Sequence, residues 1–216
     1  MKNCKKSLLV AGLVSTLFIS MANTTFANSK NEEKINSDLE NKITDIKDHW
    51  AKKPIIEAMK KKLMLGTSDR LFSPNEKITR GEFITILGRL GKVDTKKYLE
   101  VKDKNIESGK FYTEYMNWAV ENKLLPKTSK ALGDENITRE EMAHILASYL
   151  KVMGDDTSTL KLFVYDDEKE ISDWAYEDIQ FLANKDILCG TSNNKFSPKE
   201  NLTRAEVAQI ISKLSK

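Results

Sequence analysis

The sequence predicts an all-α protein built from three helix–loop–helix repeats that close around a shared core. A phrase of the pattern hydrophobic–Thr–Arg–x–Glu–hydrophobic occurs at 78–83, 137–142 and 202–207. Each copy is followed by an apolar stripe at helical spacing. Other motifs occur at the same sequence spacing from the first and from the third copy. Fixed spacing over several motifs indicates an internal repeat.

Residues 1–27 have the order of a secretory signal peptide. Three lysines precede an almost uncharged apolar run, and small residues follow, ending at Ala27. The alternative is a membrane anchor, but the apolar run is short for a span and cleavage-like residues follow it. We therefore expect a secreted protein with no membrane tether after cleavage.

The net charge bears on the class of partner, and the cysteine content bears on how the fold is held together. Cleavage after Ala27 removes three lysines and no acid, so the formal charge falls from +3 to zero. The mature chain then has no basic excess that would indicate nucleic acid or an anionic membrane as partner. Cys189 is the one cysteine left, so no internal disulfide forms and packing must hold the fold.

The mature chain divides into a leader and three repeats. Residues 28–43 are polar, with apolar residues at every fourth position near the end, and read as a spacer or a short docking helix. Repeat 1 covers 44–92, repeat 2 covers 98–153 and repeat 3 covers 160–216. A lone helical hairpin of this size cannot bury its stripe, so the three repeats should share one core.

Repeats 1 and 3 match closely, whereas repeat 2 has diverged. Trp50 precedes Arg80 by 30 residues, and Trp174 precedes Arg204 by the same distance. In repeat 2, Pro126 stands where the other repeats have glycine, and no tryptophan occupies the matching position.

Helix initiation explains four of the six positions in the repeated phrase. The threonines are N-caps, each with a glutamate three residues later, and together they form capping boxes: Thr79, Thr138 and Thr203. The flanking hydrophobic residues suit a hydrophobic staple.

The arginine is not explained in this way. Arg80, Arg139 and Arg204 fall at the first helical position, where the helix dipole disfavours a cation by roughly 0.3–1 kcal/mol. A guanidinium beside exposed helix N–H groups would bind a carboxylate or phosphate. The alternative is a salt bridge between repeats to an acid such as Asp45 or Asp166. The two hypotheses differ in whether loss of the arginine unfolds the protein.

The tryptophans leave a similar choice open. Most tryptophans in small helical domains anchor the core. Trp50 and Trp174, however, lie beside polar residues at a predicted helix start, where an exposed indole would stack on a sugar. Trp118 lies within an apolar stripe and is expected in the core.

Together these motifs resemble the S-layer homology (SLH) motif. In repeat 1 the resemblance rests on residues 49–51 (His-Trp-Ala), Gly66, 72–74 (Phe-Ser-Pro) and 78–82. Residues 173–175 through 202–206 match it equally well, and 98–153 resemble a divergent copy. The resemblance covers roughly 44–216.

The resemblance implies a three-pronged, pseudo-threefold assembly of the SLH type around a central helical bundle. It also implies that the module anchors an exported protein non-covalently to a Gram-positive cell wall or S-layer. The implied ligand is a secondary cell-wall polysaccharide linked to peptidoglycan, often pyruvylated, bound in grooves between repeats. Other surface-layer proteins are further candidate partners, and no cofactor is implied.

The resemblance also assigns site residues by motif position. The arginines that would pair with ligand carboxylate are Arg80, Arg139 and Arg204. The tryptophans that would pack on sugar are Trp50 and Trp174, and the glycines that would let the backbone approach it are Gly66 and Gly190. Phe111 or Tyr112 would substitute for the missing tryptophan of repeat 2.

The sequence does not indicate catalysis. His49 and His144 are the two histidines, and no metal-ligand cluster, P-loop, G-x-S-x-G or H-E-x-x-H motif is present. We therefore expect a protein that is not an enzyme. The alternative functions are a surface scaffold that presents 28–43 or a face of repeat 2 to a protein partner and, more distantly, a wall-modifying enzyme.

Overall fold

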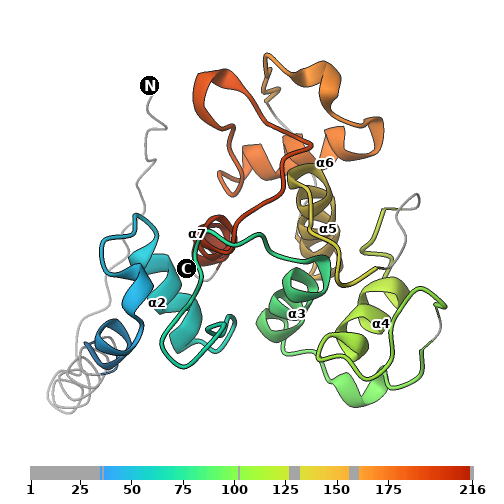
Figure 1. Ribbon diagram of the computed structural model, residues 1–216. Coiled ribbons are helices and arrows are strands. Elements are labelled where there is room, and N and C mark those ends of the chain that lie inside the picture. Colours follow the sequence, from blue (N-terminus) through green and yellow to red (C-terminus); the bar gives the residue numbers. More distant parts are fainter. Residues whose placement is uncertain (1–34, 36, 102, 127–131, 156–160, 215–216) are drawn as a thin grey trace, which may run out of the picture.

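The computed structural model describes residues 35, 37–101, 103–126, 132–155 and 161–214. Throughout these residues the regular structure is helical and no β-strand is present (Figure 1). The α-helices are α2 (Lys52–Lys60), α3 (Arg80–Leu90), α4 (Thr113–Glu121), α5 (Arg139–Val152), α6 (Asp173–Asn184) and α7 (Arg204–Leu214). Short 3-10 helices cover Thr44–Ile46, Thr95–Lys97, Glu168–Glu170 and Ser192–Asn194. The prediction of an all-α fold is confirmed.

Helices α3 and α7 begin with the predicted capping box, whereas α5 has only the Thr138 half of it among the described residues, because the Glu141 carboxylate pairs with Arg80. At α3 the Thr79 hydroxyl accepts the Glu82 N–H at 3.2 Å, and the Glu82 carboxylate accepts the Thr79 N–H at 2.9 Å. The same reciprocal bonds start α7, at 3.2 and 2.7 Å. At α5 the Thr138 hydroxyl accepts the Glu141 N–H at 3.3 Å. Each cap satisfies backbone donors that the helix itself leaves open.

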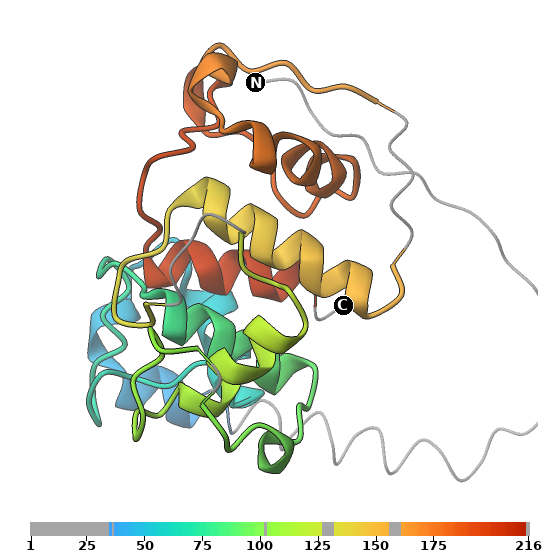
Figure 2. The same cartoon turned by 90° about the vertical axis from the view of Figure 1, so that its right-hand side faces the viewer.

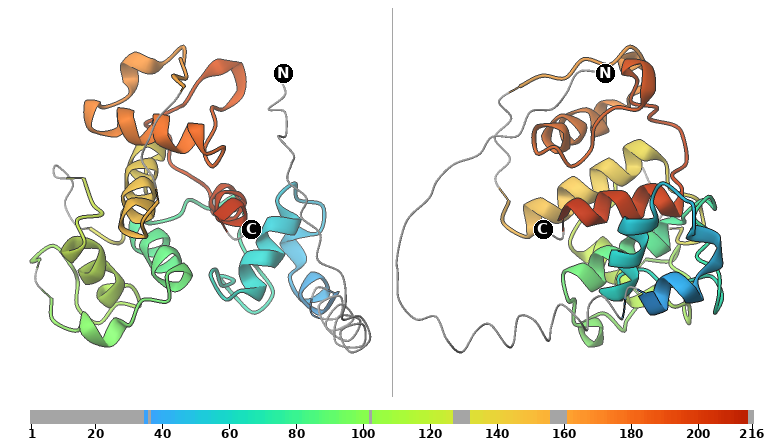
Figure 3. Two further views of the ribbon diagram at one scale, coloured as in Figure 1. Left: turned by 180° about the vertical axis from the view of Figure 1, so that it is seen from behind. Right: turned by 90° about the vertical axis from the view of Figure 1, so that its left-hand side faces the viewer.

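The helices pair between repeats, and not within them. α2 packs against α7, α3 against α4, and α5 against α6, so every pair joins two different repeats. Figure 1 shows α3, α5 and α7 at the centre, each with its partner outside it. The three central helices run side by side in roughly the same direction (Figure 2, Figure 3). The central helical bundle is thus formed by the helices that begin with the repeated phrase.

A closed cycle of backbone hydrogen bonds joins the three repeats just before the central helices. The Ile78 N–H donates to Leu202 O at 3.0 Å, the Leu202 N–H to Ile137 O at 3.3 Å, and the Ile137 N–H to Ile78 O at 3.1 Å. All three side chains are buried. The hydrophobic residue of the phrase therefore links repeats, in addition to any stapling of its own helix. A pseudo-threefold rotation between the repeats stays a prediction.

Helices α3 and α4 approach closely because glycines line the contact. A methyl group on Gly81 would lie 2.5 Å from Cδ1 of Tyr112, and one on Gly88 would lie 2.3 Å from Cδ1 of Tyr115. Gly133 covers the other face of the Tyr112 ring, where a methyl group would lie 2.4 Å from Cε2. Tyr112 is therefore enclosed between two backbone segments.

The leader is described only in part. Residues 37–42 are helical, Leu39 packs against the core, and Glu40 pairs with Lys52 at 2.7 Å. The predicted signal peptide, 1–27, lies outside the described residues. Within the described part of the chain, no helix combines the length and apolar character that crossing a membrane requires.

Candidate functional site

The arginines of the repeated phrase are buried where repeats meet. Arg80 and Arg204 are each 5% exposed and Arg139 is 8% exposed. The backbone N–H groups of Arg80, Arg139 and Arg204 donate, respectively, to Glu135 O, Glu200 O and Glu76 O, each in the loop of another repeat, at 2.8–2.9 Å. The hypothesis of exposed helix N–H groups is therefore wrong at this position, because the neighbouring loop occupies them.

Arg204 has three different partners. Its Nε donates to Phe72 O at 2.9 Å, Nη1 to Glu82 Oε1 at 2.8 Å, and Nη2 to Leu65 O at 2.6 Å. The guanidinium also lies over the Phe72 ring, 4.7 Å from its centroid. Burial lowers the pKa of Arg204, and the nearby Glu82 carboxylate opposes that shift.

Arg80 forms a buried bidentate ion pair. Nε and Nη2 donate to the two carboxylate oxygens of Glu141, at 2.5 and 3.1 Å. Nη1 donates to Leu132 O, and Glu135 lies 3.5 Å away. The side chains of Arg80 and Glu141 are 6% and 9% exposed, so the pair is shielded from water.

Arg139 is bonded much less completely. Nη2 donates to Cys189 O at 2.6 Å, and the guanidinium lies over the Phe196 ring at 5.1 Å. Nε is buried without a hydrogen-bond partner. In the described part of the chain, no carboxylate lies within ion-pair distance of this arginine. Burial lowers the pKa of Arg139, and the more distant Glu206 opposes the shift.

The acids that meet the arginines are not the two that the sequence suggested. Asp45 accepts the N–H groups of Phe72 and Ser73, at 3.0 and 2.7 Å, and Asp166 accepts from the Asn194 amide at 2.9 Å. The salt bridges between repeats exist. Arg80 lies 3.5 Å from Glu135 in the neighbouring loop. The closer acids are Glu141, for Arg80, and Glu82, for Arg204. These two closer glutamates stand in the repeated phrase itself, which is the sequence signal for them.

One hollow brings together predicted site residues from all three repeats. Groove A, a cavity of about 280 Å³, lies between the loop at 63–67 and helix α3. Its remaining lining residues are Glu82, Thr85, Ile86, Arg89, Phe111 and Arg204. Gly66, Phe111 and Arg204 therefore share one site.

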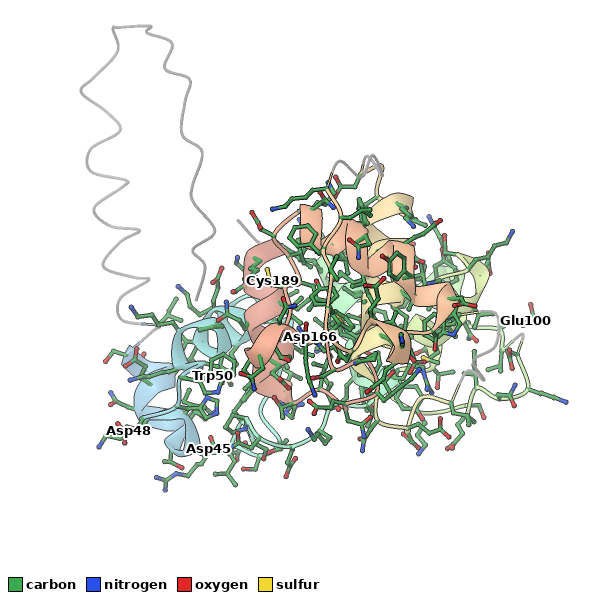
Figure 4. All side chains as sticks on the ribbon, turned by 90° about the horizontal axis from the view of Figure 1, so that it is seen from above. Asp45, Asp48, Trp50, Glu100, Asp166 and Cys189 are labelled. Carbon is green, nitrogen blue, oxygen red and sulfur yellow. The ribbon has the colours of Figure 1, made fainter. Side chains whose placement is uncertain are left out.

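A second hollow repeats this construction. Groove B, a cavity of about 190 Å³, is bounded by the segment 187–190, including Gly190, and by α7. Its remaining lining residues are Trp50, Arg139, Glu206, Gln209, Ile210 and Lys213. Trp50 and Cys189 lie on the opposite side of the molecule from Glu100 (Figure 4). Gly190, Trp50 and Arg139 share this site.

The two grooves match position by position. Phe111 takes the place in groove A that Trp50 takes in groove B, and the two rings are 62% and 63% exposed. Sequence reasoning missed the helical wall of each groove, with Thr85 and Arg89 in A and Gln209 and Lys213 in B. These residues lie on polar helix positions that carry no motif signal.

The other predicted site residues line neither groove. Tyr112 is 1% exposed and donates to Asp134 at 2.8 Å, and burial is the largest cause that raises its pKa to about 12. Trp174 is half-buried with its ring against His144, centroids 5.5 Å apart. His144 is paired with the buried Asp178 at 2.6 Å. Arg80 is enclosed by its partners from repeat 2.

The groove glycines are required by the loops themselves. A methyl group on Gly66 would lie 2.6 Å from Leu71 O and 2.7 Å from Ser68 O, and one on Gly190 would lie 2.8 Å from Lys195 O. Each loop thus folds back over its own glycine. Access of a ligand to the backbone there stays a prediction.

The described residues contain no cluster of three or more His, Cys, Asp or Glu side chains that would hold a metal ion. Each groove is lined by a single carboxylate, Glu82 or Glu206. Both carboxylates are engaged in capping boxes. The grooves therefore present cations, an aromatic ring and apolar floors, which suits binding of a polar ring-shaped ligand.

Comparison with known proteins identifies the motif. A sequence model of the S-layer homology domain matches residues 42–84 and 164–208. The chain is 34% identical over 172 residues to an amylopullulanase of Thermoanaerobacterium thermosulfurigenes, covering 78% of this chain and 9% of that protein. It is 29% identical over 171 residues to exoglucanase XynX of Acetivibrio thermocellus, covering 78% of this chain and 16% of that protein. An S-layer protein of Bacillus thuringiensis subsp. finitimus is 26% identical over 175 residues, covering 78% of this chain and 20% of that protein. The chain spans less than a quarter of the length of these relatives.

Proposed function

The chain carries S-layer homology domains, and from this premise we propose that it anchors non-covalently to the cell wall by binding secondary wall polysaccharide in grooves A and B. The observation that carries the proposal is the twin construction of the grooves. Each combines a buried arginine, a glycine loop, a polar helix face and an exposed aromatic ring, drawn from three repeats. Divergence of repeat 2 has left this combination intact in groove A, where Phe111 supplies the ring.

The chemistry of the two grooves together suits an acidic sugar polymer. An exposed aromatic ring packs on the apolar face of a pyranose, as at many polar-rimmed sites. A guanidinium binds a carboxylate with planar, directed hydrogen bonds, and burial strengthens the contact because water competes less. A pyruvate ketal would supply such a carboxylate on a sugar ring. We therefore propose a pyruvylated polysaccharide as ligand.

Binding without catalysis fits the same geometry. Glycoside hydrolysis uses two carboxyl groups on either side of the scissile bond. Each groove has one carboxylate in its lining, and that carboxylate is held in a helix cap. Two grooves on one molecule would instead add avidity along a repetitive polymer, because the second contact forms at high effective concentration.

Sedimentation with purified cell walls tests this function. The full chain is mixed with walls before and after chemical removal of the polysaccharide. We expect sedimentation with intact walls, and a loss of at least tenfold for the double variant Trp50→Ala, Phe111→Ala. Leu99→Ala is the matched control, because Leu99 is 67% exposed and lines neither groove.

Two results would contradict the proposal. Equal sedimentation with stripped peptidoglycan would exclude the polysaccharide as ligand. Wild-type sedimentation of the double variant, lost when the walls are treated with protease, would favour the scaffold alternative with a protein partner.

A further inference from the structure

Grooves A and B differ at two nitrogen atoms of their arginines, Nη1 and Nε, both of which are bonded in Arg204. In groove A, Nη1 of Arg204 donates to Glu82 Oε1 at 2.8 Å. In groove B, Nη1 of Arg139 has no hydrogen-bond partner among the residues that the structure describes, and Nε is also without one. The arginine is therefore paired with a carboxylate in groove A, whereas in groove B two of its nitrogen donors have no partner among the described residues.

The orientation of the capping glutamate accounts for the difference. Glu82 bridges two groups, with Oε2 on the Thr79 N–H and Oε1 on Arg204. Glu206, at the same position in groove B, turns Oε2 toward both the backbone N–H and the hydroxyl of Thr203, at 2.7 and 2.8 Å. Its carboxylate serves its own helix cap and stays beyond ion-pair distance of Arg139.

A buried cation without a nearby carboxylate favours an incoming anion. Arg139 is 8% exposed, so it has lost most of its hydration and has gained one backbone carbonyl and the Phe196 ring in return. A carboxylate that enters groove B would complete the coordination of this guanidinium. A carboxylate that enters groove A would have to displace Glu82, a carboxylate already placed at hydrogen-bond distance.

The other lining residues are alike in the two grooves. Lys213 of groove B corresponds to Arg89 of groove A, and both cations donate to the backbone: Lys213 Nζ to Asp186 O and Ile187 O, at 3.0 and 3.1 Å, and Arg89 Nη1 to Leu63 O at 3.2 Å. Apolar residues form both floors, at 63, 64 and 86 in groove A and at 187, 188 and 210 in groove B. The difference between the grooves therefore lies in the contacts of Arg204 and Arg139.

We propose that the two grooves take different residues of one polymer, a carboxylate-bearing sugar in groove B and an uncharged sugar in groove A. This assignment rests on the proposed function of the grooves and deepens it. It makes Arg139 the residue that recognises the acid, and Glu82 the residue that excludes an acid from groove A.

Calorimetric titration of the full chain tests the assignment. The charged probe is a methyl glycoside that carries a pyruvate ketal, and the neutral probe is the methyl ester of the same compound. We expect the charged probe to bind one site, groove B, and the ester to bind that site at least tenfold more weakly. Arg139→Gln should weaken binding of the charged probe at least tenfold, and Leu99→Ala should retain the site.

The variant Glu82→Gln gives a test by gain. Glutamine keeps the cap, because its amide oxygen still accepts the Thr79 N–H, but it removes the charge that competes at Arg204. We expect the number of carboxylate sites to rise from one to two. This measurement stays informative even if Arg139→Gln fails to fold, which circular dichroism would reveal.

Several outcomes would overturn the assignment. These are two equivalent sites in the wild type, loss of the single site in Arg204→Gln instead of Arg139→Gln, no gain in Glu82→Gln, or no binding of the charged probe at all. Wall sedimentation separates this failure from failure of the proposed function. A chain that sediments with intact walls but shows any of these results keeps the function and loses the division between grooves.

Discussion

Replacing Arg80 should lower the stability of the protein more than replacing Arg139 does. Replacing Arg139 should weaken ligand binding more than replacing Arg80 does. The two residues occupy the same position in the repeated phrase and differ in what they contact. Arg80 neutralises the buried Glu141 through two hydrogen bonds, whereas Arg139 donates one bond to a backbone carbonyl. Arg80→Gln and Arg139→Gln therefore compare a buried ion pair with a buried, incompletely bonded cation.

The expected magnitudes follow from burial. Removing the guanidinium from a carboxylate that is 9% exposed should cost about 3–5 kcal/mol in the free energy of unfolding. Removing Arg139 loses one charge-assisted bond but also removes a desolvated cation, so we expect a cost of at most about 2 kcal/mol. For a chain of this size, 4 kcal/mol corresponds to a fall in Tm of about 10 °C.

Urea denaturation followed by circular dichroism measures the difference. Arg80→Gln should lower the midpoint by about 2 M with an unchanged slope. The double variant Arg80→Gln, Glu141→Gln should recover most of the loss, because no buried charge then remains at the pair. In the titration with the charged probe, Arg139→Gln should lose more affinity than Arg80→Gln. A loss of less than 1 kcal/mol for Arg80→Gln, or no recovery in the double variant, would refute the reasoning.

Two further predictions concern the surroundings of the grooves. Gly81→Ala should destabilise the protein by about 1–2 kcal/mol, because overpacking against Tyr112 exceeds the gain in helix propensity of about 1 kcal/mol. Thermal unfolding measures this effect, and a rise in Tm would contradict the described packing. Asp167→Asn should cost about 1.5–3 kcal/mol, because Asp167 accepts the N–H groups of Phe196 and Ser197 at 2.8 and 2.7 Å. Burial raises the pKa of Asp167, but these bonds outweigh it and lower the pKa overall. The stabilisation of the fold by ionised Asp167 is thus fully present above the pKa of an ordinary aspartate. It is lost as the pH falls through the lowered pKa of Asp167 in the folded protein. The gap between wild type and Asp167→Asn should close in acid, and a constant gap down to pH 2 would show that ionisation contributes nothing.

The helices and their starts could be predicted from the sequence, but the ion pairs and the helix packing between repeats could not. The capping boxes depend on residues three positions apart, so Thr79 and Glu82 were sufficient to place the start of α3. The partner of Arg80 is Glu141, in another repeat, and no local pattern selects it over Asp45. An apolar stripe likewise shows that a helix is covered on one side without showing which helix covers it.

The candidate site divides in the same way. The motif positions of Gly66, Gly190, Trp50 and the arginines were readable, and so was a replacement ring near 111. The choice of Phe111 over Tyr112 required the structure, because adjacent residues at a helix start point in different directions. Tyr112 turned inward because Gly81 and Gly133 leave room for its ring.

The pairing of α2 with α7 has a consequence for how the protein reaches its native state. These helices cover Lys52–Lys60 and Arg204–Leu214, and each covers the apolar face of the other. At a synthesis rate of about 5–20 residues per second, α2 waits roughly 7–30 s for its partner. Contacts of such long range slow folding, because a large loop must close before they form. Until α7 packs against α2, the apolar face of α2 lacks that cover, and transiently exposed apolar surface of this kind favours aggregation.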